Sequence, residues 1–178
     1  MKERKVTISM AWANVFSIIL LIVAAVVMIV VYRLLWGDFH FGDGDRLMRD
    51  VVLLVALFGG IVVHELIHGL TWALYAKQGW KSISFGVMWK ILTPYCHCSE
   101  PLVLRHYIVG TLMPLVVLGI VPLVLGLAIG SFLVALYGVV FISTACGDIL
   151  LVWKLRHEKA SSTVLDHPTE AGCVVYEE

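Results

Sequence analysis

Residues 51–75 read VVLLVALFGGIVVHELIHGLTWALY, an apolar stretch with two histidines and one glutamate inside it. A helix needs about 20 mostly apolar residues to cross the ~30 Å of hydrocarbon in a bilayer, and this stretch is long enough. A carboxylate at the centre of a membrane costs on the order of 2.5–3.5 kcal/mol on insertion scales, so an acidic residue without a role is disfavoured at Glu65. The stretch therefore predicts a membrane-spanning helix with a functional polar site inside it.

On either side of this stretch, three further apolar stretches are long enough to span a membrane. The later two meet at Gly130-Ser131, where a tight helical hairpin is expected, and Pro114 and Pro122 predict kinks in its first helix, which membrane bundles tolerate. We predict an all-α integral membrane protein of about four spans, with a short strand-like segment between the second and third. The predicted spans are 10–32, 51–76, 104–128 and 131–153, all within a membrane domain 10–153, and the polar ends are 1–9 and 154–178.

The composition agrees with a membrane protein and argues against several other classes. Apolar residues make up 60% of the 178 residues and charged residues 15%, and the mean hydropathy is +0.93. Typical soluble domains are roughly 45–50% apolar and about 25% charged. Thirteen Lys and Arg balance thirteen Asp and Glu, so no basic excess points to nucleic acid. A soluble enzyme, a nucleic-acid-binding domain and a disordered linker are therefore disfavoured.

The distribution of basic residues predicts the orientation. Lysines and arginines gather before the first span, between the second and third spans, and after the fourth: Lys2, Arg4, Lys5, Lys77, Lys81, Lys90, Lys154, Arg156 and Lys159. The loop after the first span has three arginines, but four aspartates offset them. The positive-inside rule then places both termini in the cytoplasm. The first apolar run is too long for a cleavable signal peptide, so we expect it to be retained.

The segment Ser82–Val87 alternates polar and apolar residues, which predicts a short strand. Met88–Leu92 is the candidate partner strand. Such a strand could bind an unwound substrate segment by β-addition. An ordinary interfacial loop is the alternative.

His64, Glu65 and His68 fit the motif His-Glu-x-x-His. At 3.6 residues per turn, the two histidines project from nearly the same helix face, one turn apart. Two neutral imidazoles at this spacing can bind one Zn²⁺ at ~2.0–2.1 Å, and the adjacent carboxylate can act as general base on a water that zinc activates. The alternative is a buried polar cluster that joins helices by hydrogen bonds.

A catalytic zinc site needs a third protein ligand. Outside the motif, Asp148 is the intramembrane ionisable residue that qualifies, and it lies toward the same side of the membrane as His64 and His68. Gly147 is expected to let the fourth span approach the second closely. The alternatives are that Asp148 reaches the lipid headgroups or pairs with Lys154.

Cys96, His97 and Cys98, together with His106, offer a second metal site. Cys-x-Cys is tighter than the Cys-x₂₋₄-Cys spacing of structural zinc sites, so an ordinary loop with reduced thiols is favoured.

Several motifs together resemble a family of small bacterial membrane proteins described as zincin peptidases. They span roughly residues 50 to 178: His64-Glu65-x-x-His68-Gly69, Phe85-Gly86, Pro94-Tyr95-Cys96-His97-Cys98, Pro101-Leu102, Pro114, Gly147-Asp148 and Asp166-His167-Pro168 with Gly172-Cys173. The chain is more distantly similar to the site-2-protease type of intramembrane zinc metalloprotease. That resemblance implies His64, His68 and Asp148 as zinc ligands and Glu65 as general base. It also implies a bacterial cytoplasmic membrane.

The sequence therefore predicts a zinc-dependent intramembrane endopeptidase. Its expected partners are a membrane-protein substrate and the lipid bilayer, with no nucleic acid. The alternative is a non-catalytic membrane adaptor or chaperone with a structural metal site, which would not need Glu65. A metal-ion carrier ranks third, because the spans hold few carboxylates for an ion path.

Overall fold

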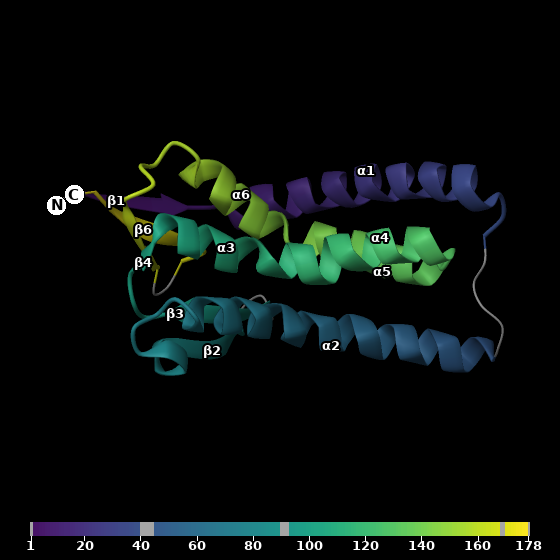
Figure 1. The fold of residues 1–178 in the computed structure, drawn as a ribbon, viewed down its shortest axis with the longest axis horizontal. Helices are drawn as coiled ribbons and strands as arrows, with labels where there is room; N and C mark the ends of the chain where they lie inside the picture. The colour runs from purple at the N-terminus through teal and green to yellow at the C-terminus, as the bar shows by residue number, and fades with distance from the viewer. Residues whose placement is uncertain (1, 40–44, 90–92, 168–169, 178) are drawn as a thin grey trace.

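The computed structural model describes residues 2–39, 45–89, 93–167 and 170–177. Long helices run side by side along one axis, and the strands and both chain termini lie at one end of this bundle (Figure 1). The helices are α1 (Met10–Trp36), α2 (Arg46–Ala73), α3 (Leu104–Pro114), α4 (Val121–Ile129), α5 (Phe132–Thr144) and α6 (Cys146–Leu155). The strands are β1 (Lys2–Thr7), β2 (Ile83–Met88), β3 (Thr93–Cys98), β4 (Leu102–Val103), β5 (Thr163–Asp166) and β6 (Gly172–Glu177).

Among the described residues, three helical segments are long and apolar enough to cross a membrane: α1, α2 and the run Leu104–Ile129. In that run a π-helical turn, Leu115–Ile120, joins α3 to α4. The turn begins directly after Pro114, where the missing N–H interrupts regular helical hydrogen bonding. Helices α5 and α6 meet the same criterion only as a pair, which is bent by 47°, so the number of spans rises to four if the pair counts as one. The length and composition of these segments are those of a membrane protein.

A tight helical hairpin joins α4 to α5, as predicted. Gly130 has a φ of 71°, a left-handed conformation that favours glycine, and it ends α4. Ser131 follows at the position directly before α5. Glycines then let the two helices pack closely. A Cβ on Gly138 of α5 would lie 2.8 Å from the Leu123 Cα of α4, and one on Gly126 of α4 would lie 2.7 Å from the Ala135 Cα of α5.

Adding a methyl group at this interface is expected to destabilise the protein. Gly138→Ala should lower the free energy of unfolding by about 1–3 kcal/mol, because the clash is with backbone atoms that cannot rotate away. Gly59→Ala on α2 is the matched control, since a Cβ there meets nothing within 4 Å. Thermal unfolding in detergent, followed by circular dichroism, measures both variants. Equal midpoints for the two variants would contradict the close packing of α4 on α5.

The all-α prediction is too narrow, because both polar ends of the chain form strands. An antiparallel sheet of order β1-β6-β5-β4 joins the N-terminal segment to the C-terminal tail. The sheet buries apolar side chains against α3 and α6, and this core includes Val6, Tyr107, Leu155, Val164 and Val175. Residues at opposite ends of the sequence thus pair in space at the end of the bundle that holds both termini (Figure 1).

The strand predicted over Ser82–Val87 is confirmed as β2, but its partner differs from the prediction. Lys90, Ile91 and Leu92 of the expected partner lie outside the described residues. Strand β2 pairs instead with β3, with Phe85 opposite Cys96. Both strands pack on α2 at Gly69, where a Cβ would lie 2.6 Å from the Phe85 ring. Glycine at this position lets the hairpin lie directly against the helix that carries the His-Glu-x-x-His motif.

Candidate metal centre and active site

Three side chains from two helices converge beside the hairpin. His64 and His68 lie one turn apart on α2 and are buried, and Asp148 lies in the first turn of α6. The two Nε2 atoms are 3.2 Å apart. The carboxylate oxygens of Asp148 lie 3.3 Å from His64 Nε2 and 3.5 Å from His68 Nε2. Across the described residues, this is the one group of at least three His, Cys, Asp or Glu whose ligand atoms all lie within 4.8 Å of one another.

These spacings fit a zinc ion. Zinc bonds of about 2.0–2.1 Å place neighbouring ligand atoms of a tetrahedral site about 3.3–3.4 Å apart. The Nε2–Nε2 separation of 3.2 Å is close to that value, and each Nε2 has a different oxygen of the Asp148 carboxylate at 3.3 or 3.5 Å. Two imidazoles and one carboxylate are also a donor set used by catalytic zinc, which leaves a fourth position for water or substrate.

The ring orientation of His68 is fixed by its neighbours. Its Nδ1 lies 2.9 Å from the Gly110 carbonyl oxygen of α3, so Nδ1 carries a proton, and Nε2 is the ring nitrogen that faces His64 and Asp148. The ring also stacks on Trp72, with centroids 5.2 Å apart, and the Trp72 Nε1–H donates to the Tyr107 carbonyl. Both contacts leave the His68 ring in an orientation suited to metal binding.

The bend between α5 and α6 directs Asp148 toward α2. The side chains of Ser143 and Thr144 each donate to a backbone carbonyl three residues earlier, at 2.7 and 3.0 Å. Hydroxyl groups bonded back to a helix in this way often bend it. Helix α5 ends there, and α6 starts at an angle of 47° to it, with Asp148 in its first turn.

Two expectations about the surroundings of Asp148 are not met. Gly147 does not help α6 to approach α2, because a Cβ there would meet Ile8, on the N-terminal side of α1, at 3.6 Å. The alternative ion pair with Lys154 is absent, since Lys154 Nζ donates to the Thr7 carbonyl at 2.6 Å. Asp148 faces the two histidines instead.

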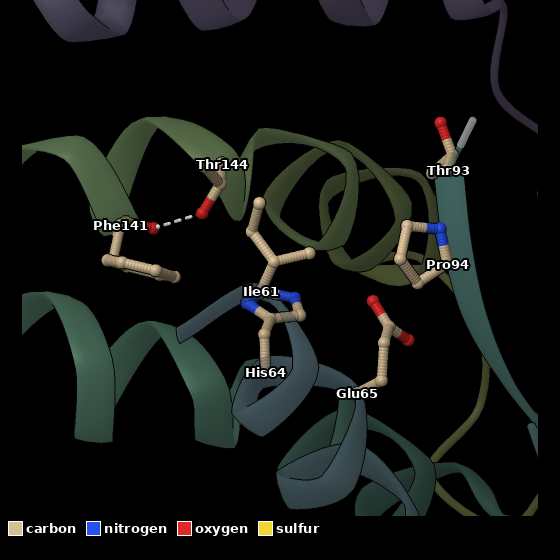
Figure 2. A pocket seen from close by; sticks show the side chains of 7 residues that line it. All are labelled: Ile61, His64, Glu65, Thr93, Pro94, Phe141 and Thr144. Carbon is tan, nitrogen blue, oxygen red and sulfur yellow. Dashed lines mark hydrogen bonds between the residues drawn. The ribbon is translucent and has the colours of Figure 1, made fainter. Parts of the chain in front are cut away.

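Glu65 lies outside the three-residue cluster and faces a cavity. The Cys96 backbone N–H of β3 donates a hydrogen bond to its carboxylate. The cavity has a volume of about 270 Å³, and Figure 2 shows its walls coming from α2, α5 and β3. The lining residues are Ile61, His64, Glu65, Thr93, Pro94, Phe141 and Thr144. A carboxylate positioned at a cavity next to a metal-binding cluster can act as a general base on a molecule bound there.

Comparison with known proteins agrees with this geometry. A family model described as "Putative zincin peptidase" matches residues 57–163, more than half of the chain. The chain belongs to this family. No curated protein and no solved structure matches the chain. The matched segment contains His64, Glu65, His68 and Asp148. Membership of the zincin peptidase family supports a zinc metallopeptidase, and the three-residue cluster supplies donors suited to the ion.

In this zincin peptidase chain, the second metal site considered at Cys96, His97, Cys98 and His106 does not form among the described residues. His106 stacks on Tyr75, with ring centroids 4.1 Å apart. Burial raises the pKa of both the Cys96 and the Cys98 thiol above its usual range, which disfavours the thiolate that a metal requires. In this segment the Cys96 N–H faces the Glu65 carboxylate.

A buried carboxylate from the tail supports the site, and the sequence did not assign it this role. Asp166 of β5 accepts hydrogen bonds from the Tyr107 hydroxyl at 2.5 Å and from the Cys98 backbone N–H at 2.9 Å. Burial raises the pKa of the Asp166 carboxyl, although these hydrogen bonds oppose the rise. Tyr107 stacks in turn on Trp72, the neighbour of His68. The signal available in the sequence was the Asp166-His167-Pro168 pattern of the family resemblance, of which Pro168 lies outside the described residues.

Removing the Asp166 carboxylate is expected to destabilise the fold. Asp166→Ala should lower the free energy of unfolding by on the order of 3 kcal/mol, because it leaves two buried donors without an acceptor. Glu170→Ala is the control, since Glu170 pairs with Lys5 at the exposed surface and its loss should leave the unfolding midpoint unchanged. Thermal unfolding in detergent measures both. A midpoint for Asp166→Ala equal to that of Glu170→Ala would show that the network does not stabilise the fold.

Proposed function

We propose that the protein is a zinc-dependent endopeptidase that cleaves membrane-embedded segments of other proteins. The observation that carries this proposal is the convergence of His64, His68 and Asp148 at zinc-compatible spacings. The cluster lies on helices of membrane-protein composition, and Glu65 faces the adjoining cavity. In this proposal the two histidines and the aspartate bind the metal, and Glu65 is the catalytic residue.

Each residue has a defined chemical task in the proposed reaction. When bound, zinc supplies Lewis acidity that polarises a carbonyl group and makes water more acidic. The Glu65 carboxylate takes a proton from the attacking water and passes it to the amine nitrogen that leaves when the peptide bond breaks. The Gly110 carbonyl holds the His68 imidazole in one tautomer, and the Cys96 N–H holds the Glu65 carboxylate beside the cavity. These contacts keep the reacting groups in place before the substrate binds.

The surroundings of the site favour a membrane-embedded substrate. The cavity is bounded by α2 and α5, both of which belong to apolar helical segments. A substrate helix must unwind locally before it reacts, because its amides are hydrogen-bonded within the helix. The membrane protein to be cleaved and the lipid bilayer are thus the proposed partners. We place the protein in a bacterial cytoplasmic membrane, with the sheet and both termini on the cytoplasmic side.

Metal-dependent release of fragments tests this function. Membranes containing the protein are treated with a zinc chelator, divided, and incubated with or without added zinc, and new protein termini are mapped by mass spectrometry. We expect fragments cut within membrane-spanning segments only where zinc is restored. If both samples give identical fragments although the zinc-restored protein binds about one zinc per chain, the metal site is structural and the protein is a non-catalytic adaptor.

A further inference from the structure

The cavity beside Glu65 has walls that are suited to binding a side chain. Ile61 lies one turn before His64 on α2, and Phe141 and Pro94 face the same space from α5 and β3 (Figure 2). Among the described residues that line it, His64 and Glu65 are the ionisable ones, and none is a lysine or an arginine. An acidic side chain would meet the Glu65 carboxylate with no described lysine or arginine in the wall to pair with it, and a basic one would occupy the proposed general base. The lining therefore favours an uncharged apolar group.

The cavity is large enough for one such group. An apolar cavity of about 150 Å³ holds a benzene molecule. The volume of about 270 Å³ thus accommodates a leucine or phenylalanine side chain and leaves room for the reacting atoms. Ile61 is 39% exposed and Thr144 is also exposed, so the cavity is open at these two residues. The Phe141 ring is buried and packs on Tyr137, with centroids 4.6 Å apart, which makes it a rigid wall.

The strand that borders the cavity offers little backbone recognition. Pro94 has no N–H, and the Cys96 N–H already donates to Glu65. These two positions of β3 leave no free amide donor for a substrate strand. Strand β2, which the sequence suggested for β-addition, supplies none of the residues that line the cavity. Selection of the substrate near the cleaved bond then depends on a side chain that enters the cavity.

We propose that this cavity is a specificity pocket that accepts one uncharged apolar side chain adjoining the cleaved bond. Ile61, Pro94 and Phe141 form its apolar walls, and Glu65 excludes acidic side chains. This inference rests on the proposed peptidase function, since it assigns the substrate class of the same site. Substrates are segments with an apolar residue, such as leucine or phenylalanine, at the position next to the bond that breaks.

Binding of small zinc-chelating compounds tests the pocket without requiring cleavage. The probes are three dipeptide hydroxamates that differ only in the side chain next to the chelating group, which is that of leucine, glycine or aspartate. Their affinities for the zinc-loaded protein in detergent are measured by titration calorimetry. We expect the leucine compound to bind at least about tenfold more tightly than the glycine compound. The aspartate compound should bind no more tightly than the glycine compound.

A substitution that fills the pocket is compared with the same substitution outside it. Ile61→Phe should weaken binding of the leucine compound by at least about tenfold and leave the glycine compound unchanged. Val62→Phe is the control, since Val62 is the next residue on α2, is 57% exposed and does not line the cavity. This variant should bind all three compounds as the wild type does.

The outcomes separate the pocket from the proposed function. Equal affinities for the leucine and glycine compounds, or equal losses in Ile61→Phe and Val62→Phe, would overturn the pocket while leaving the zinc site intact. Protein that holds zinc but binds none of the hydroxamates would also overturn the pocket. Protein that holds no zinc would overturn the proposed function and the pocket together.

Discussion

Glu65→Gln is expected to lower the rate of substrate cleavage by about 10²–10⁴-fold while the zinc content stays at the wild-type level. Glutamine has nearly the same shape and can still accept the Cys96 N–H through its amide oxygen, but it cannot take a proton from water. The three proposed metal ligands should remain in place, because Glu65 is not one of them. The measurement combines metal analysis of the purified variant with its cleavage rate on a substrate identified by the zinc-restoration experiment.

Glu3→Gln is the matched control for this substitution. Glu3 lies on the exposed surface of β1, far along the chain from the motif, and the same chemical change there should leave both cleavage and zinc content unaltered. Full activity in Glu65→Gln would show that another group transfers the proton. Loss of zinc in Glu65→Gln would instead make Glu65 a metal ligand.

The sequence predicted the parts of the site that depend on local geometry. His64 and His68 lie one turn apart, and any α-helix that contains them brings their side chains to one face. Asp148 could be selected because a carboxylate inside an apolar span is rare. The structure brings Asp148 to the two histidines, as the sequence analysis expected of a metal-binding cluster. It does so through the bend between α5 and α6, which the apolar pattern of residues 131–153 does not reveal.

The strands at the chain ends could not be predicted in the same way. Strand β1 has the sequence KERKVT, in which charged residues dominate, and such a segment beside an apolar helix is typical of a membrane flank. Its partner β6 lies at the other end of the chain, and pairing over that distance leaves no local signal. The support that Asp166 gives to Tyr107 and Cys98 depends on this sheet, so it too became visible only in the structure.

The hairpin of β2 and β3 beside the site could be predicted only in part. Alternation of polar and apolar residues predicted β2, but Met88–Leu92 was the wrong partner, since β2 pairs with Thr93–Cys98. Pro94 makes that segment a weak strand by sequence pattern. Proline is tolerated there at the edge of a two-stranded sheet, facing the cavity. Pro94, which weakens the strand pattern in the sequence, is thus also the residue that removes an amide donor from the cavity wall.

Asp148→Ala is expected to weaken zinc binding by at least about 10²-fold. Loss of a residue that only hydrogen-bonds to a zinc ligand weakens binding by up to about 10²-fold, and Asp148 would itself be a ligand. The variant also leaves the Nε2 atoms of His64 and His68 without the carboxylate that now lies 3.3 and 3.5 Å away. The measurement is zinc per chain after equilibration with a chelating resin. We expect about one zinc in the wild type and a clear loss in the variant, with cleavage lost in parallel.

Asp50→Asn is the control, since Asp50 is an exposed carboxylate on α2 that faces Arg49 rather than the histidines, and this variant should keep its zinc. The comparison also separates the proposed site from a helix-packing cluster. If His64, His68 and Asp148 only join α2 to α6 by hydrogen bonds, the wild type will bind no zinc and Asp148→Ala will change thermal stability alone. If the variant keeps a full complement of zinc, the third ligand is another residue, and Glu65 must then be tested as a ligand instead of a base.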